Sequence, residues 1–209
     1  CRMIFINFKT YREASLANAA ALAASLAGAI NDLSEEKRVE VKLIVCPQAV
    51  DLKDVSVAAL TCEIWAQHVD AVEEGRNTGF FPPAVAEQSG ATGTLLNHSE
   101  HKVSKNELAK TVKLCKEAGL KILIFADSLE EARVVSGLKP DYIGYEPPEF
   151  VGSRTTSVTS AKPDVIKAVV EAVKPIPVIV GAGVHSREDV EVSLRLGAVG
   201  IAVATDVVL

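Results

Sequence analysis

Short and almost continuously apolar stretches recur along the chain, and longer segments of mixed polarity separate them. Apolar runs of this length are typical of parallel strands that are buried on both faces of a sheet. The predicted strands are Met3–Ile6, Val41–Cys46, Glu63–Gln67, Gly93–Leu96, Lys121–Phe125, Tyr142–Tyr145, Val178–Val180 and Gly200–Val203. Helical patterns lie between them, at Glu13–Leu33, Pro82–Ser89, Lys105–Ala118, Leu129–Leu138, Pro163–Val173 and Arg187–Leu196, whereas Gln48–Leu60 is the least clearly helical interval. This alternation predicts an α/β fold with a parallel sheet and right-handed crossovers.

Eight predicted strands favour a closed (β/α)8 barrel, with an open doubly wound sheet as the alternative. No linker rich in Pro, Gly or Ser divides the chain, so we expect a single domain over residues 1–209. Only Thr205–Leu209 follows the last strand, and a complete barrel needs a helix there. The barrel is therefore expected to lack its final C-terminal helix, which would expose the outer faces of the first and last strands. Either the sequence is truncated or the protein covers that flank in another way.

The amino-acid composition excludes several classes of protein. Hydrophobic residues make up 48% of the 209 residues, which is enough for a substantial core. The net charge of −5 argues against nucleic acid or an anionic membrane surface as the main partner. No apolar run has the length of a transmembrane helix, and the first residues resemble no signal peptide. The four cysteines follow no metal or disulfide spacing, which favours a reducing cytoplasm, with the buried ones acting as small hydrophobic residues.

Candidate catalytic residues lie at the carboxyl ends of three predicted strands. The first strand ends in Asn7-Phe8-Lys9, the fourth in Asn97-His98-Ser99-Glu100, and the sixth in Glu146-Pro147-Pro148-Glu149. A cation, a histidine and a carboxylate thus recur where an apolar strand becomes a loop. In a closed parallel barrel these ends meet at one mouth, which predicts an active site there.

Five motifs carry a resemblance to a known family. They are Ile6-Asn7-Phe8-Lys9-Thr10-Tyr11, Ala66-Gln67-His68-Val69-Asp70, Gly93-Thr94-Leu95-Leu96-Asn97-His98-Ser99-Glu100, Tyr145-Glu146-Pro147-Pro148-Glu149-Phe150-Val151-Gly152 and Gly181-Ala182-Gly183-Val184. In this order they resemble the triosephosphate isomerase family, and in particular its compact archaeal branch. The resemblance implies a TIM (β/α)8 barrel that interconverts dihydroxyacetone phosphate and D-glyceraldehyde 3-phosphate through an enediolate, in glycolysis and gluconeogenesis. Enzymes of this family tune the acid–base properties of their active-site side chains.

The resemblance implies roles for the strand-end residues. Glu146 is expected to be the base that takes a proton from carbon and returns it. His98 is expected to be the electrophile, kept neutral if a helix begins directly after it. Lys9 and Asn7 are expected to stabilise the developing negative charge, with Glu100 supporting the cluster.

Further substrate and phosphate contacts follow from the same resemblance. They fall at Val151, Gly152, Ser153, Gly181, Ala182, Gly183, Ala204 and Thr205. The first three belong to Pro147–Thr156, which resembles a lid that excludes water from the intermediate. Two residues depart from the archaeal pattern, because Arg154 and Asp206 stand where relatives have glycine. A carboxylate at position 206 would repel a phosphate dianion, unless Asp206 points away and caps a helix.

Partners and cofactors are predicted from the same motifs. The segment Asp70–Phe80 resembles a loop that docks into a neighbouring subunit, so a homo-oligomer, dimer or tetramer, is expected, although an ordinary surface loop has similar residues. His98-Ser99-Glu100 matches the His-x-Glu of zinc deaminases, but the Pro-Cys-x-x-Cys that they require is absent from the sequence. We therefore expect no metal and no cofactor. The alternatives are another phosphate-binding barrel enzyme, or a truncated or decayed family member that binds phosphorylated metabolites without turnover.

Overall fold

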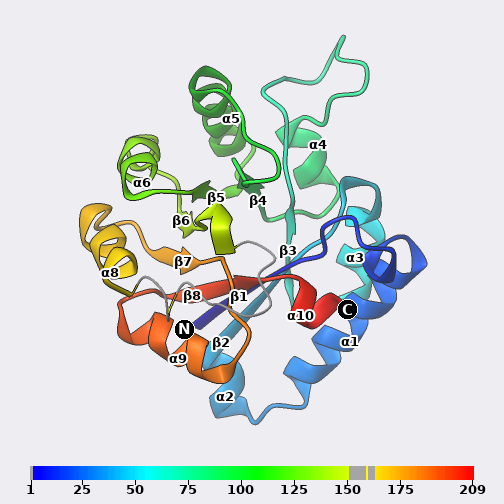
Figure 1. Cartoon of the computed structure of the whole chain (residues 1–209). Helices are drawn as coiled ribbons and strands as arrows, with labels where there is room; N and C mark the ends of the chain where they lie inside the picture. Colours follow the sequence, from blue (N-terminus) through cyan, green and yellow to red (C-terminus); the bar gives the residue numbers. More distant parts are fainter. Residues whose placement is uncertain (1, 151–158, 160–162) are drawn as a thin grey trace.

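The strands close into a barrel in which the first and last strands meet (Figure 1). The computed structural model describes residues 2–150, 159 and 163–209. The strands are β1 (Arg2–Asn7), β2 (Val41–Cys46), β3 (Glu63–Ala66), β4 (Gly93–Leu96), β5 (Lys121–Ala126), β6 (Tyr142–Tyr145), β7 (Val178–Val180) and β8 (Gly200–Val203). All neighbours are parallel, and β1 pairs with both β2 and β8. The predicted closed barrel is confirmed, and the open sheet is excluded.

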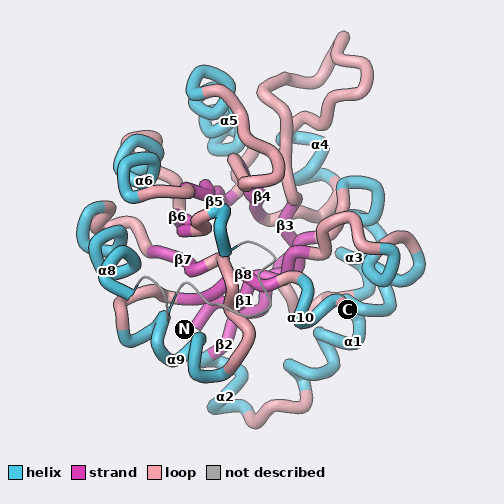
Figure 2. Tube along the Cα trace, in the orientation of Figure 1, coloured by secondary structure: helices cyan, strands magenta, loops and turns pink. Residues whose placement is uncertain are grey.

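Helices surround the strands on the outside of the barrel (Figure 2). They are α1 (Ala17–Asn31), α2 (Glu35–Glu40), α3 (Leu52–Ala58), α4 (Pro83–Gln88), α5 (Lys105–Glu117), α6 (Leu129–Ser136), α8 (Pro163–Ala172), α9 (Arg187–Arg195) and α10 (Thr205–Val208), with short 3-10 turns at Arg12–Ala14, Ala49–Asp51 and Pro148–Phe150. Several begin with the side-chain caps that their sequences predict: Ser104 accepts the N–H of Glu107 at the start of α5, and Ser128 does the same for Glu131 in α6. No helix in the described part of the chain is long and apolar enough to cross a membrane.

Two layers of apolar side chains hold the barrel together. The inner layer fills the barrel with Met3, Phe5, Ile44, Cys46, Trp65, Leu95, Leu123, Phe125, Ile179 and Ala202. Phe5 and Trp65 pack edge to face with ring centroids 5.1 Å apart. Gly93 makes room for this pair, because a Cβ there would lie 2.4 Å from the Trp65 ring. The outer layer, between strands and helices, is also apolar, so strand residues are buried on both faces as their sequences predict.

The first helix begins later than the pattern predicts. Residues Arg12–Ala14 form a separate 3-10 turn, and α1 starts only at Ala17, because Leu16 has a φ of 55°. The Leu16 N–H donates to Asp51 Oδ2 at 3.1 Å, and Asp51 is buried. Asp51 belongs to the following βα unit, so the periodicity of the residues around Leu16 could not predict this contact. The weakly helical interval after β2 does contain a helix, α3.

The end of the chain covers more of β1 and β8 than expected. The sequence predicted no full-length final helix, and the described residues after β8 form the four-residue α10, whose Val208 is buried in the outer core layer. Ile6 and Ile201, on the outer faces of β1 and β8, are only 2% and 5% exposed. Only Ile4 and Val203 remain half-buried on this flank. The expectation that these outer faces are exposed is therefore wrong for their central residues.

Two of the cysteines behave as small core residues, as predicted. Cys46 and Cys115 are fully buried and unpaired. Burial raises the pKa of the Cys115 thiol to about 12 and also raises the pKa of Cys46, because a thiolate loses its hydration inside the core. Neither thiol is therefore a candidate nucleophile.

Barrel closure depends on a glycine in β8. A Cβ at Gly200 would lie 2.1 Å from the Met3 carbonyl oxygen in β1. We predict that Gly200→Ala lowers the free energy of unfolding by about 1–3 kcal/mol, because β1 and β8 must separate to admit the methyl group. Urea titration followed by circular dichroism measures the change. Gly28→Ala is the matched control, since Gly28 lies within α1 with nothing within 4 Å of its added Cβ and should gain up to about 1 kcal/mol. Equal stability of the two variants would contradict this account of closure.

Candidate active site

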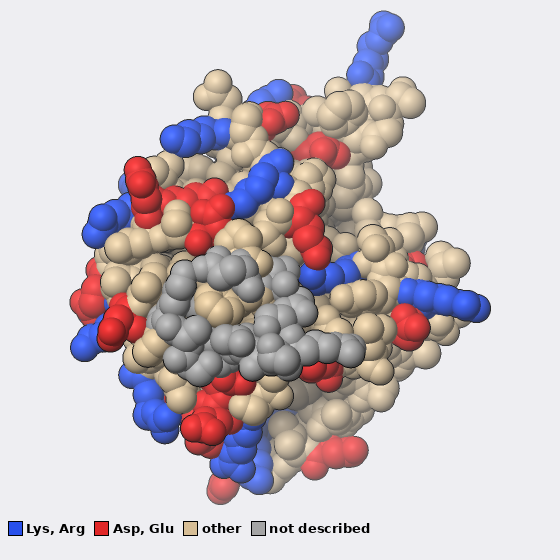
Figure 3. Space-filling view, in the orientation of Figure 1, with Lys and Arg blue, Asp and Glu red and all other residues tan. Residues whose placement is uncertain are grey.

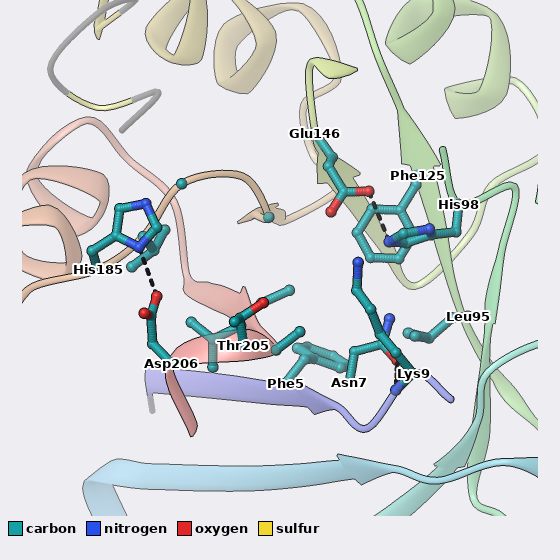
Figure 4. A pocket seen from close by; sticks show the side chains of 16 residues that line it. Phe5, Asn7, Lys9, Leu95, His98, Phe125, Glu146, His185, Thr205 and Asp206 are labelled. Atoms are coloured by element: carbon teal, nitrogen blue, oxygen red, sulfur yellow. Dashed lines mark hydrogen bonds and ion pairs between the residues drawn. The ribbon is translucent and has the colours of Figure 1, made fainter. Parts of the chain in front are cut away.

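A pocket opens where the carboxyl ends of β1, β4, β6, β7 and β8 converge. It is lined by Phe5, Asn7, Lys9, Leu95, His98, Phe125, Glu146, Gly181, Gly183, Val184, His185, Ala202, Val203, Ala204, Thr205 and Asp206. The predicted cation, imidazole and carboxylate thus share one cavity, although they lie far apart in sequence (Figure 4). On the face of the molecule drawn in Figure 3, acidic and basic side chains are interspersed.

His98 is held with its two ring nitrogens in different roles. Its Nδ1 accepts the backbone N–H of Glu100 at 3.1 Å, and its Nε2 lies 3.0 Å from Glu146 Oε2. A neutral ring that accepts at Nδ1 carries its proton on Nε2, so the N–H group faces the pocket and the carboxylate. The ring also packs against the edge of Phe125, with centroids 5.0 Å apart at 82°. The geometry therefore selects one tautomer and one orientation.

No helix begins directly after His98, so the condition under which a helix dipole would act on its ring is not met. The His101 N–H donates to the His98 carbonyl at 2.8 Å in a turn, and α5 begins only at Lys105. Ser104 explains this start, because it caps α5. The backbone N–H of Glu100, and not a helix terminus, therefore faces Nδ1 of the His98 ring.

Glu146 is a buried carboxylate aimed into the pocket. It follows β6 directly and is 5% exposed. Its main chain is fixed by the bond from its N–H to the Ala126 carbonyl at 2.9 Å. Besides His98, the Ser99 hydroxyl donates to its Oε2 at 3.3 Å. A carboxylate in this setting can accept a proton from a ligand without water in between.

Lys9 is positioned by its backbone as well as by its charge. Its φ of 49° is unusual for a lysine, and its N–H donates to Asn7 Oδ1 at 2.9 Å. Gln67 Nε2 bridges the carbonyls of Lys9 and Cys46, at 3.0 Å each. The ammonium group points toward the space below Glu146 and His98 (Figure 4) and lies 2.6 Å from Glu100 Oε1. Glu100 therefore contacts residues from two strand ends: its side chain forms an ion pair with Lys9, and its backbone N–H donates to His98.

Asn97, Ser99 and Gln67 are site residues to which the sequence assigned no role, although all three belong to quoted motifs. Asn97 is 3% exposed and has a φ of 58°, a conformation that asparagine tolerates better than most residues. Its Nδ2 donates to the Phe125 carbonyl and to Glu131 Oε1, both at 2.9 Å. It therefore ties the turn that carries His98 to β5 and α6.

The other end of the pocket is built from small residues, as predicted. Gly181, Gly183, Ala204 and Thr205 line it, and Gly183 has a φ of 60°, which favours glycine. Ala182 is 1% exposed and does not line the pocket. The hydroxyl groups of Thr205 and Tyr11 lie 3.2 Å apart, which ties the loop after β8 to the loop after β1.

Asp206 neither faces the pocket unpaired nor caps a helix. The N-cap position of α10 is Ala204, and Asp206 lies in the first turn. Its Oδ2 is 2.6 Å from Nδ1 of His185, a residue that sequence analysis missed (Figure 4). The alternative in which Asp206 caps a helix is therefore excluded, and the carboxylate pairs with a residue 21 positions away that local sequence patterns do not reveal.

The predicted lid is described only in part. Pro147 is buried, and Pro148–Phe150 forms a 3-10 turn after Glu146. Val151, Gly152, Ser153 and Arg154 lie outside the described residues. Their contacts with substrate remain predictions.

A barrel whose mouth joins a buried carboxylate, an oriented imidazole and an ammonium group is typical of enzymes that move protons next to a carbonyl. A family model described as triosephosphate isomerase matches residues 2–208. Triosephosphate isomerases of Methanopyrus kandleri and Methanothermus fervidus are 40% and 37% identical to this chain over 99% of its length and 90% and 91% of theirs. That of Methanocaldococcus jannaschii is 36% identical over 99% of this chain and 92% of its own.

The chain therefore belongs to the triosephosphate isomerase family. The predicted class, an aldose–ketose isomerase, is confirmed by this membership. So is the predicted reaction, the interconversion of dihydroxyacetone phosphate and D-glyceraldehyde 3-phosphate.

We predict that Asn97→Ala lowers the free energy of unfolding by at least about 2 kcal/mol, because it leaves a buried carbonyl without its donor and strains the backbone at positive φ. It should also lower kcat, since the turn that carries His98 loses its anchor. Urea titration and initial rates measure the two effects. Asn106→Ala, at an exposed position of α5, is the matched control and should change stability by less than about 0.5 kcal/mol. A similar loss in both variants would show that Asn97 anchors nothing.

Proposed function

We propose that Glu146, His98, Lys9 and Asn7 carry out the triose phosphate isomerisation at this pocket. The single observation that carries the proposal is the contact of 3.0 Å between His98 Nε2 and Glu146 Oε2, with Nδ1 occupied by the Glu100 N–H. It leaves the imidazole one proton, on the nitrogen that faces the base. At this separation, the His98 donor can reach the carbonyl oxygen of a small substrate while the Glu146 base reaches the neighbouring carbon.

The reaction follows from these positions. The substrate carbonyl oxygen replaces Glu146 as acceptor of the His98 Nε2–H. Glu146 then takes a proton from the carbon next to the carbonyl, and an enediolate forms. His98 moves a proton between the two oxygens, Glu146 returns its proton to the neighbouring carbon, and neither residue is changed at the end.

Negative charge on the enediolate oxygens requires fixed positive partners. Lys9 supplies a full charge from the β1 end. Asn7 uses its Oδ1 for the Lys9 N–H, so its amide NH2 is left as a donor for substrate. Glu100 holds the Lys9 ammonium until the enediolate forms and is placed as a positioning residue.

The phosphate is assigned to the opposite end of the pocket. Backbone N–H groups of Gly181–Gly183 and of Ala204–Thr205 are the proposed donors, since the small residues there let a phosphate approach the main chain. The resemblance adds Val151, Gly152 and Ser153 from the lid.

We predict that Glu146→Gln lowers kcat by about 10²–10⁴-fold with little change in the circular dichroism spectrum, because the amide keeps the shape and removes the base. The assay follows conversion of glyceraldehyde 3-phosphate by coupling to reduction of the dihydroxyacetone phosphate formed. Glu130→Gln, an exposed position in α6, is the matched control and should retain the wild-type rate. A Glu146→Gln variant with wild-type kcat would remove Glu146 from the mechanism. Wild-type protein no faster than the variant would support the alternative of binding without turnover.

A homo-oligomer assembled through Asp70–Phe80 remains our proposal. The segment projects from the barrel between β3 and α4 (Figure 1). Two bonds close its base: Asp70 N–H to the Phe81 carbonyl at 2.8 Å, and Phe81 N–H to Asp70 Oδ2 at 2.6 Å. Phe80 is the last residue of the segment, next to this base, and is 56% exposed, which is unusual for a large apolar residue. A pre-formed loop with an exposed aromatic residue supports docking into a second copy.

Phe80→Glu should therefore dissociate the oligomer, because a carboxylate replaces an apolar contact at the interface. Sedimentation velocity gives the mass of each variant. Val39→Glu in α2, where Val39 is 73% exposed, is the control and should keep the wild-type mass. A monomeric wild type, or a Phe80→Glu variant of unchanged mass, would refute docking through this loop.

A cytoplasmic location is also proposed. Cys46, Cys62 and Cys115 are all free thiols, which is typical of proteins in a reducing compartment.

A further inference from the structure

The pocket has two differently charged ends. Glu146 and Lys9 supply the ionic groups of the end where the proton moves. At the other end the titratable side chains that line the pocket are His185, from the loop after β7, and Asp206, from α10 (Figure 4). The proposed phosphate site lies between Gly183 and Thr205, on the same two loops. The net charge of the His185–Asp206 pair therefore acts directly on a phosphate group bound at this end of the pocket.

The pair is held in place from both sides. His185 Nδ1 and Asp206 Oδ2 are 2.6 Å apart, and the two side chains are 26% and 46% exposed. The His185 N–H donates to Asp189 Oδ2 at 3.1 Å, and Asp189 also closes the capping box of α9 with Ser186. Asp206 is fixed in the first turn of α10. A short contact between two anchored residues is set by the fold and needs no ligand to form it.

A carboxylate beside a phosphate dianion is unfavourable unless a cation accompanies it. The imidazole is placed to be that cation, because its Nδ1 contacts the Asp206 carboxylate while its Nε2 is left outside this contact (Figure 4). A phosphate bound nearby adds negative charge, and carboxylate and phosphate together stabilise the doubly protonated ring. In that state His185 and Asp206 form a neutral pair, and Nε2–H is an additional donor.

We propose that His185 is a specificity-determining residue for the phosphate group: it neutralises the Asp206 carboxylate, and so allows the pocket to accept a dianion. This inference rests on the proposed assignment of the phosphate to this end of the pocket. It resolves the conflict raised by the sequence, in which the Asp206 carboxylate stands beside the expected phosphate site. The pair, rather than either residue alone, is the functional unit.

The test is a double-mutant cycle on KM for glyceraldehyde 3-phosphate and on the Kd of inorganic phosphate from calorimetry. His185→Asn should raise both constants about tenfold, about 1.4 kcal/mol, because it leaves the carboxylate unpaired at a partly screened position. It should change kcat by less than about threefold, since the group does not touch the reacting carbons. The double variant His185→Asn/Asp206→Asn should recover most of the loss, and Asp206→Asn alone completes the cycle. If His185 had only a structural role, the double variant would not recover the KM and the phosphate Kd.

Glu188→Gln is the matched control for the rescue, because Glu188 is an exposed carboxylate in the first turn of α9 that does not line the pocket. It should not restore the His185→Asn variant. A KM and a phosphate Kd within twofold of wild type in His185→Asn, a double variant no better than the single one, or rescue by Glu188→Gln would each overturn the proposal. The phosphate Kd needs no turnover, so an inactive wild type would refute the proposed mechanism while the binding series still decides the role of His185.

Discussion

Closure of the sheet between β1 and β8 is the constraint on which the rest of the structure depends. Met3–Ile6 pairs in register with Gly200–Val203, so the two ends of the chain form one wall of the barrel. That wall carries Asn7 and Lys9 on one strand end and Ala204, Thr205 and Asp206 on the other. Neither the ammonium group nor the proposed phosphate loop would face Glu146 without this pairing. The active site therefore depends on contacts between residues at opposite ends of the sequence. Contacts between residues so far apart cost the most loop-closure entropy when they form.

Within the closed barrel, backbone groups orient the side chains that are proposed to react. One N–H, from Glu100, selects the tautomer of His98, and one carbonyl, from Phe125, holds Asn97 beneath it. The first of these bonds is partly buried and the second is buried, so water competes with them less than with exposed ion pairs. This explains how a turn rather than a helix can hold the imidazole. It also explains why polar residues with no part in the chemistry lie so close to the site.

Much of this could be predicted from the sequence, and the failures have physical causes. The strands could be predicted because burial on both faces leaves continuous apolar runs. The proposed catalytic trio could be predicted because each member ends such a run inside a family motif. The start of α1 was misplaced because Leu16 is bonded to Asp51, which belongs to the next βα unit. The partner of Asp206 was missed for the same reason, since His185 lies on a different loop. Periodicity reports local burial, and it carries no information on which distant polar groups meet.

The central claim is that one carboxylate, Glu146, moves a proton on one face of a bound triose phosphate. Deuterium exchange tests it most directly: dihydroxyacetone phosphate is incubated with the protein in heavy water, and its C1 hydrogens are followed by proton NMR. The account predicts that only one of the two C1 hydrogens is replaced, and that Glu146→Gln abolishes the exchange. Replacement of both hydrogens at similar rates, or no exchange above that in buffer, would contradict it.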